Sequence, residues 1–172
     1  PHGSLQLLAE VGKFLQKEDL FPERADRFVF AMAPLVVLMS TFLVFVVVPA
    51  GPTAVVENLD TGIFFALAVG SLSVIGILMA GWASANKYSL MGGLRAAGQL
   101  IAYELPLVLA VVGVVMQAGT LSLQGIVVAQ SHFALFGLNT RGLPYVVPQF
   151  AGFLIFLIAA QAELTQTPFD MP

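Results

Sequence analysis

The sequence predicts an all-α protein: a polytopic bundle of about four membrane-spanning helices, preceded by one helix that lies along the membrane surface. Of its 172 residues, 58% are hydrophobic and only 10% are charged, whereas roughly a quarter of the residues of an ordinary soluble domain are charged. Four stretches without a charged side chain each exceed the roughly 18 residues that a transmembrane helix needs. They are residues 28–56, 61–86, 105–140 and 142–162. The composition therefore argues strongly against a water-soluble enzyme.

Charge and composition also limit the partners. The net charge is −3 and no basic stripe is present, which argues against a nucleic-acid partner. The chain has no cysteine, so it cannot supply thiolate ligands to an iron–sulfur cluster or a zinc ion. The two histidines, His2 and His132, have no ligand partner at a suitable spacing, and we expect no metal site. Any redox centre must therefore belong to another chain.

Residues 5–17 are too polar to cross a bilayer but show helical periodicity. At 3.6 residues per turn, one half of the helix is apolar and the other half carries lysine, glutamate and glutamine. The apolar residues are Leu7, Leu8, Val11, Phe14 and Leu15. This pattern is typical of a helix lying in the membrane interface. A helix of a soluble domain is the alternative.

The first two transmembrane helices are expected over residues 28–48 and 63–83. Pro49, Gly51 and Pro52 end the first one, because proline cannot continue a helix. The second carries small residues on one stripe, which lets neighbouring helices approach closely in lipid. The stripe consists of Ala66, Gly70, Ser73, Gly76, Ala80 and Ser84.

The second half of the chain is expected to hold two more spans, over residues 97–118 and 145–163. Before the third span, residues 85–97 contain glycines, Lys87 and Arg95, and we expect a polar loop there. Residues 119–144 form a longer connection with room for a short helix. The chain starts at Pro1 and stops within a turn-like string, so we expect an internal piece of a longer protein.

The basic residues predict the orientation. With four spans, six of the seven fall on the same side as the surface helix, and this side is cytoplasmic by the positive-inside rule. They are Lys13, Lys17, Arg24, Arg27, Lys87 and Arg95, against Arg141 on the other side. The chain end at 168–170 would then lie next to the Lys87–Arg95 segment.

Glu104 is the most informative polar residue. It follows Arg95 by nine positions, which at about 1.5 Å per residue places it near the middle of a roughly 30 Å hydrocarbon core. A carboxyl group there must face protein or a hydrated cavity, where it can exchange a proton. Pro106 is expected to open the helix beside it, and Gln99 and Tyr103 extend the polar strip. The alternative is a neutral, hydrogen-bonded structural glutamate.

Two further acids are candidates for proton handling. Glu163 is expected at the cytoplasmic end of the fourth span, where an ordinary interfacial carboxylate is an equal alternative. Asp170 lies between Pro168 and Pro172, which restrict the backbone and so fix the direction of the carboxylate. By composition alone it could be an ordinary turn residue. Neither an acyl-transfer constellation nor a phosphate-binding loop is evident.

Several separate strings, in order and at matching spacing, carry a family resemblance. They are residues 81–95 (GWASANKYSLMGGLR), Tyr103–Glu104, Pro168–Pro172, Lys17–Asp19 and Ala25–Asp26. With them the chain resembles the NADH dehydrogenase subunit 1 family, whose bacterial members are the H subunits of NADH-quinone oxidoreductase, respiratory complex I. The resemblance covers essentially the whole chain. Family members have about eight spanning helices, so roughly half of them would be absent here.

The resemblance implies a membrane-arm subunit of a proton-pumping oxidoreductase, with no catalytic centre of its own. It would help to form the chamber for the quinone substrate, with the surface helix at the entrance, and would contact lipid and the other membrane-arm and peripheral-arm subunits. FMN and iron–sulfur clusters would be bound by those partners. The implied location is a bacterial plasma membrane rather than a mitochondrial inner or thylakoid membrane.

The resemblance also implies roles for individual residues. Glu104 and Asp170 match the family's proton-coupling acids, and Glu163 fits less specifically. Chamber or loop contacts are expected from Asp26, Lys87, Arg95, Gln99 and Tyr103.

Three alternatives stay open. A stand-alone proton- or ion-coupled transporter should show paired discontinuous helices and internal symmetry, and the sequence shows one acidic helix with a proline and no symmetry. A purely structural anchor would leave Glu104 unexplained. The homologous subunit of a membrane-bound hydrogenase, or of the photosynthetic plastoquinone-linked enzyme, would share the same strings.

Overall fold

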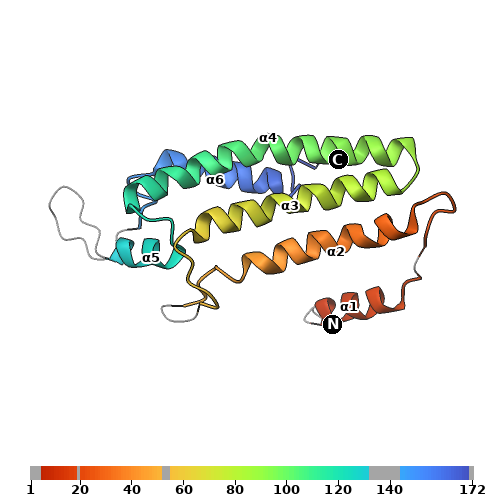
Figure 1. Ribbon diagram of the computed structural model, residues 1–172, viewed down its shortest axis with the longest axis horizontal. Helices are drawn as coiled ribbons and strands as arrows, with labels where there is room; N and C mark the ends of the chain where they lie inside the picture. The colour runs from red at the N-terminus through yellow and green to blue at the C-terminus, as the bar shows by residue number, and fades with distance from the viewer. Residues whose placement is uncertain (1–4, 19, 52–54, 132–143, 171–172) are drawn as a thin grey trace.

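The computed structural model describes residues 5–18, 20–51, 55–131 and 144–170. Within these residues the fold is all-α, as predicted, with six helices and no strand. They are α1 (Gln6–Gln16), α2 (Arg27–Val44), α3 (Gly62–Ala83), α4 (Lys87–Ala118), α5 (Leu123–Ser131) and α6 (Phe150–Glu163). The helices α2, α3 and α4 lie side by side as long rods, and α6 lies along part of α4 (Figure 1).

Three of these helices are long and apolar enough to cross a membrane. They are α2, α3 and α4, with 18, 22 and 32 residues. Helix α6 is also apolar but has only 14 residues, about 21 Å at 1.5 Å per residue, whereas α4 measures about 48 Å. Because residues 145–149 form turns instead of helix, α6 is shorter than the expected fourth span and covers only part of α4.

The polar loop expected over residues 85–97 is wrong. The turn between α3 and α4 is only three residues long, from Ser84 to Asn86, and α4 begins at Lys87. Asn86 caps the helix, since its side chain accepts a hydrogen bond of 2.9 Å from the Tyr88 backbone N–H. The glycines that suggested a loop serve helix packing instead: a Cβ on Gly81 would lie 3.2 Å from the Cα of Gly93.

The expectation that Pro106 opens its helix is also wrong. Helix α4 continues through Pro106, as α2 continues through Pro34. A proline removes one backbone donor and leaves a carbonyl group of the preceding turn without its helical partner. Helices in membrane bundles tolerate this, because groups of neighbouring helices can satisfy such a carbonyl group. Here α3 and α6 both pack against α4.

The small-residue stripe of α3 packs against α2 at Gly76. A Cβ added there would lie 2.9 Å from the carbonyl oxygen of Ala33 and 2.5 Å from a methyl group of Val37. Only glycine allows the two backbones to come this close, as the sequence predicts.

The ends of α2, α3 and α4 meet at one end of the bundle. The backbone N–H of Asp26 donates to the carbonyl oxygen of Ala83 over 3.1 Å, and α4 starts a few residues later. Arg24, Arg27 and Lys87 therefore lie at the same end, as the orientation argument expects. Arg141 and both histidines fall outside the described residues.

Helix α1 leaves its apolar face uncovered. None of its residues is buried, and the Leu15 side chain is 84% exposed. On the polar side, the side-chain amide of Gln6 donates a hydrogen bond to the Glu10 carboxylate over 3.2 Å. These features suit a helix at a membrane interface, which stays a prediction.

Candidate functional site

The polar strip of α4 faces the end of α6 and the turn that follows it. The Gln99 side-chain amide donates to two backbone carbonyl oxygens, of Ala162 over 2.8 Å and of Phe169 over 2.9 Å. One helical turn later, the Tyr103 ring contacts the Phe169 ring edge to face, with centroids 5.1 Å apart. We call Gln99, Tyr103 and Glu104 of α4, together with Glu163 and Phe169, the α4–α6 junction.

Helices α4 and α6 run antiparallel, and this direction places the junction in the middle of α4. Before α6 begins, Gln149 donates to the Gly113 carbonyl oxygen over 2.8 Å, whereas the end of α6 reaches Gln99. Glu104 lies about 25 Å along the axis from the first residue of α4. The junction therefore lies well inside the longest apolar helix of the chain, and both glutamates are half-buried.

The local sequence ends α6 at this level with a tight turn. Thr165 has φ 49°, the left-handed conformation that usually follows a helix end. Its backbone N–H donates to the carbonyl oxygen of Ala162, and the backbone N–H of Gln166 donates to the carbonyl oxygen of Gln161, both over 3.2 Å. The Gln161 side chain also donates to the Thr167 carbonyl oxygen over 2.6 Å. The chain thus folds back onto α4 instead of continuing as a helix.

The Glu163 carboxyl group is half-buried at the end of α6, and Glu104 of α4 lies near enough for its charge to act on it. They carry like charges, so it costs free energy to ionise both in a poorly hydrated setting. Both residues are candidates from the sequence alone. Glu163 is the last residue of α6, as the sequence predicts for the end of that helix, and the short length of α6 brings this end to the middle of α4.

The other predicted residues lie at the edge of the junction or away from it. Asp170 directly follows Phe169 and is exposed, and Arg95 is exposed one turn before Gln99. Lys87 is exposed at the start of α4. The Pro168–Asp170 turn folds onto Gln99 and Tyr103, so it lies near the Arg95 end of the Lys87–Arg95 segment and not at Lys87.

Asp26 has a structural task at the end of the bundle. Its carboxylate caps α2 and accepts hydrogen bonds from the backbone N–H groups of Phe28 and Val29 over 3.1 and 3.3 Å. The structure does not bring Asp26 to the junction.

Phe169 is a member of the junction that the sequence does not single out. The Pro-Phe-Asp string draws attention to its acid, but the aromatic ring and backbone carbonyl of Phe169 make the contacts with α4. The signal in the sequence is weak: an aromatic residue fixed between a proline and an aspartate.

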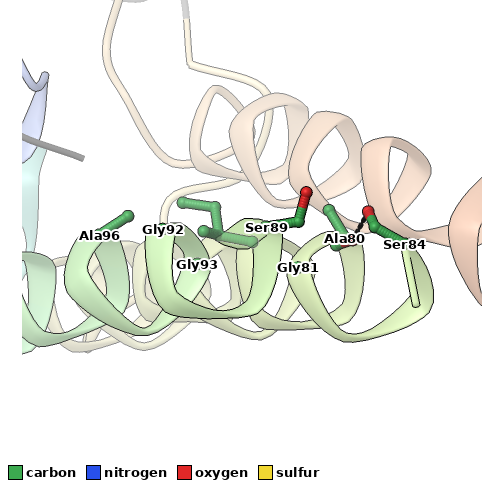
Figure 2. A pocket seen from close by; sticks show the side chains of 8 residues that line it. Ala80, Gly81, Ser84, Ser89, Gly92, Gly93 and Ala96 are labelled. Atoms are coloured by element: carbon green, nitrogen blue, oxygen red, sulfur yellow. Dashed lines mark hydrogen bonds between the residues drawn. The ribbon is translucent and has the colours of Figure 1, made fainter. Parts of the chain in front are cut away.

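A separate hollow lies between α3 and α4, with a volume of about 280 Å³. Figure 2 shows its small side chains, and the hydroxyl of Ser84, directly after α3, donates to the carbonyl oxygen of Ala80 in α3 over 2.6 Å. The lining residues are Ile77, Ala80, Gly81, Ser84, Ser89, Gly92, Gly93 and Ala96. Because glycine, alanine and serine make up most of this lining, and a Cβ on Gly81 would lie 3.2 Å from the Cα of Gly93, the hollow marks close packing of α3 against α4. Among the described residues, no group of three or more histidine, aspartate or glutamate side chains could hold a metal ion.

Comparisons with known proteins agree with the predicted family. A family model described as NADH dehydrogenase matches residues 1–172. The H subunit of the NADH-quinone oxidoreductase of Brevibacillus brevis is 45% identical over 172 residues, which are 100% of this chain and 48% of that protein. Those of Bacillus mycoides and Bacillus thuringiensis subsp. konkukian are 45% and 44% identical over 170 residues, covering 99% of this chain and 48% of each protein. The chain thus spans about half the length of these relatives.

Proposed function

This chain belongs to the NADH dehydrogenase family, and from that membership we propose that the whole protein is a membrane-arm subunit of an NADH-quinone oxidoreductase in which the α4–α6 junction couples quinone reduction to proton movement. The enzyme would transfer two electrons from NADH to a quinone, which takes up two protons to become the quinol. The observation that carries the proposal is the half-buried Glu104–Glu163 pair inside the bundle.

The physical basis is charge interaction in a region of low polarity. Reduction of a quinone creates negative charge that nearby groups must answer with protons. The interaction between two charges is several times stronger in a protein interior than in water. A carboxyl group that is partly buried beside a like charge takes up a proton more readily when a further negative charge appears nearby. Glu104 and Glu163 would thus be the first groups to convert quinone chemistry into proton movement.

The surroundings of the pair fit this role. The junction lies within the apolar bundle, so the groups between the glutamates and a quinone would be poorly hydrated. Asp170 and Arg95 lie at its exposed edge, where protons could be exchanged with water. The uncovered apolar face of α1, with Leu15 and Phe14 exposed, suits contact with lipid beside the path of a lipid-soluble quinone.

Electrons would arrive from partner subunits. The chain has no cysteine, and the FMN and iron–sulfur clusters of such an enzyme would be bound by subunits of its peripheral arm. The basic end of the bundle, with Arg24, Arg27 and Lys87, would face the cytoplasm and these subunits. We place the protein in the bacterial plasma membrane.

The test is a pair of neutral substitutions in the full-length subunit within the assembled complex, measured in bacterial membrane vesicles. Glu104→Gln and Glu163→Gln should each lower NADH–quinone reductase activity and coupled proton transport at least tenfold, an effect on the order of 1.4 kcal/mol or more. Electron transfer from NADH to ferricyanide, which needs only the peripheral arm, should persist.

Glu57→Gln is the matched control, because Glu57 is an exposed glutamate in the connection before α3. It should leave both activities unchanged. Normal, proton-coupled quinone reduction in both junction variants would refute the proposed function.

A further inference from the structure

Gln99 uses both hydrogens of its side-chain amide to hold the chain beyond α6 against α4. One bond goes to the end of α6 at Ala162 and the other to Phe169, beyond the turn. These two carbonyl groups enclose the segment that contains Glu163. A single side chain therefore links both sides of this segment to the same point on α4.

The segment that Gln99 holds is conformationally strained. Thr165 has φ 49°, a conformation that glycine adopts freely but that is a clear outlier for a β-branched residue. Such a conformation persists only where the surrounding contacts determine it. Three sets of hydrogen bonds provide those contacts: the backbone bonds of the Thr165 and Gln166 N–H groups to the end of α6, the Gln161 side-chain bond to Thr167, and the two Gln99 bonds.

We propose that Gln99 is a positioning residue: it holds the strained turn at Thr165 against α4 and thereby keeps the Glu163 carboxyl group opposite that of Glu104. The inference rests on the proposed function for its consequence, but the clamp itself is a property of the fold. Gln99 does not exchange a proton, and it acts only through the position of Glu163.

The charged groups around Glu163 make its position matter. Glu104 faces it from α4, Arg95 lies one turn before Gln99 on the same helix, and Asp170 follows Phe169 at the exposed edge. If the turn leaves α4, the Glu163 carboxyl group moves away from Glu104 and loses this neighbouring like charge. The pH profile of quinone reduction should therefore change together with the position of the turn.

The structural test is hydrogen exchange of the backbone amides in the assembled complex. The N–H groups of Thr165, Gln166 and Phe169 all donate within the turn, so they report whether it is closed. In Gln99→Ala, the loss of two hydrogen bonds should speed their exchange about tenfold or more. Thr165→Gly, added to Gln99→Ala, should slow the exchange again, because glycine adopts the left-handed conformation without strain.

The control is Gln149→Ala. Gln149 also donates a side-chain amide to a backbone carbonyl between α6 and α4, but at the opposite end of α6. It should leave the exchange of the Thr165–Phe169 amides and the pH profile of NADH–quinone reduction unchanged. Gln99→Ala should instead lower that activity about fivefold to tenfold, an effect expected from losing the two bonds, and shift its pH profile, with ferricyanide reduction unchanged.

The outcomes separate the clamp from the proposed function. Unchanged exchange in Gln99→Ala would overturn the clamp, whatever the two glutamates do. Exchange that stays fast in the double variant would overturn the claim that Gln99 opposes strain at Thr165. Fast exchange with a normal pH profile would overturn the positioning role of Gln99. Failure of the proposed function would show instead as normal coupling in Glu104→Gln, with the clamp result intact.

Discussion

The contact between α2 and α3 should be sensitive to a single methyl group at Gly76. In Gly76→Ala the new Cβ would lie 2.9 Å from the Ala33 carbonyl oxygen and 3.3 Å from the Val37 backbone nitrogen. Backbone atoms cannot rotate away as a side chain can, so the helices must separate. Overpacking of this kind costs about 1–3 kcal/mol, which lowers the equilibrium constant for closing the α2–α3 contact about fivefold to 150-fold.

Gly70→Ala on the same helix is the matched control. A Cβ added to Gly70 meets no atom within 4 Å, so the change should only improve helix propensity, by roughly 0.5–1 kcal/mol. Unfolding of the detergent-solubilised full-length subunit in a titration with sodium dodecyl sulfate measures both variants. The midpoint should fall for Gly76→Ala and rise or stay for Gly70→Ala. Equal midpoints for the two variants would refute the packing argument.

Three further predictions concern the caps and the junction. Asp26→Ala removes the cap of α2 and should cost about 1 kcal/mol of stability, seen as a lower unfolding midpoint. Asp26→Ser should restore most of this stability. A loss of quinone reduction in both variants at normal stability would instead place Asp26 in the site. The double variant of Glu104→Gln and Glu163→Gln should lose about as much proton-coupled activity as either single one, because paired groups are not additive; additive losses would show that the two carboxyl groups act separately. Phe169→Ala should remove the ring contact with Tyr103, which is worth about 0.5–1.5 kcal/mol beyond the buried area, and should speed hydrogen exchange in the turn after α6. Phe169→Tyr should preserve the slow exchange. Equal exchange in both variants would rule out a role for the ring.

Much of the fold follows from local properties of the sequence. Helix α3 lies within a few residues of its expected range because a long apolar stretch without charge has few other stable conformations in a membrane. Local patterns misplace the start of α4 because Gly92 and Gly93 are typical of loops, and only the approach of α3 shows that the Gly93 backbone is part of a helix contact. Pro106 misleads for a similar reason, since a packed membrane helix can continue through a proline, as α4 does.

The sequence by itself determined that the chain is a bundle of apolar helices, that Glu104 lies deep in one of them, and that its motifs resemble those of one family. These properties depend on residue chemistry and short-range spacing, which are visible in a single chain. Only the tertiary structure decided that the end of α6 with Glu163 lies beside Glu104 of α4. It also decided that Gln99 and Phe169 join the turn after α6 to α4. Those contacts join residues far apart in the sequence, and they depend on where α6 ends and in which direction it runs along α4, which no local pattern specifies.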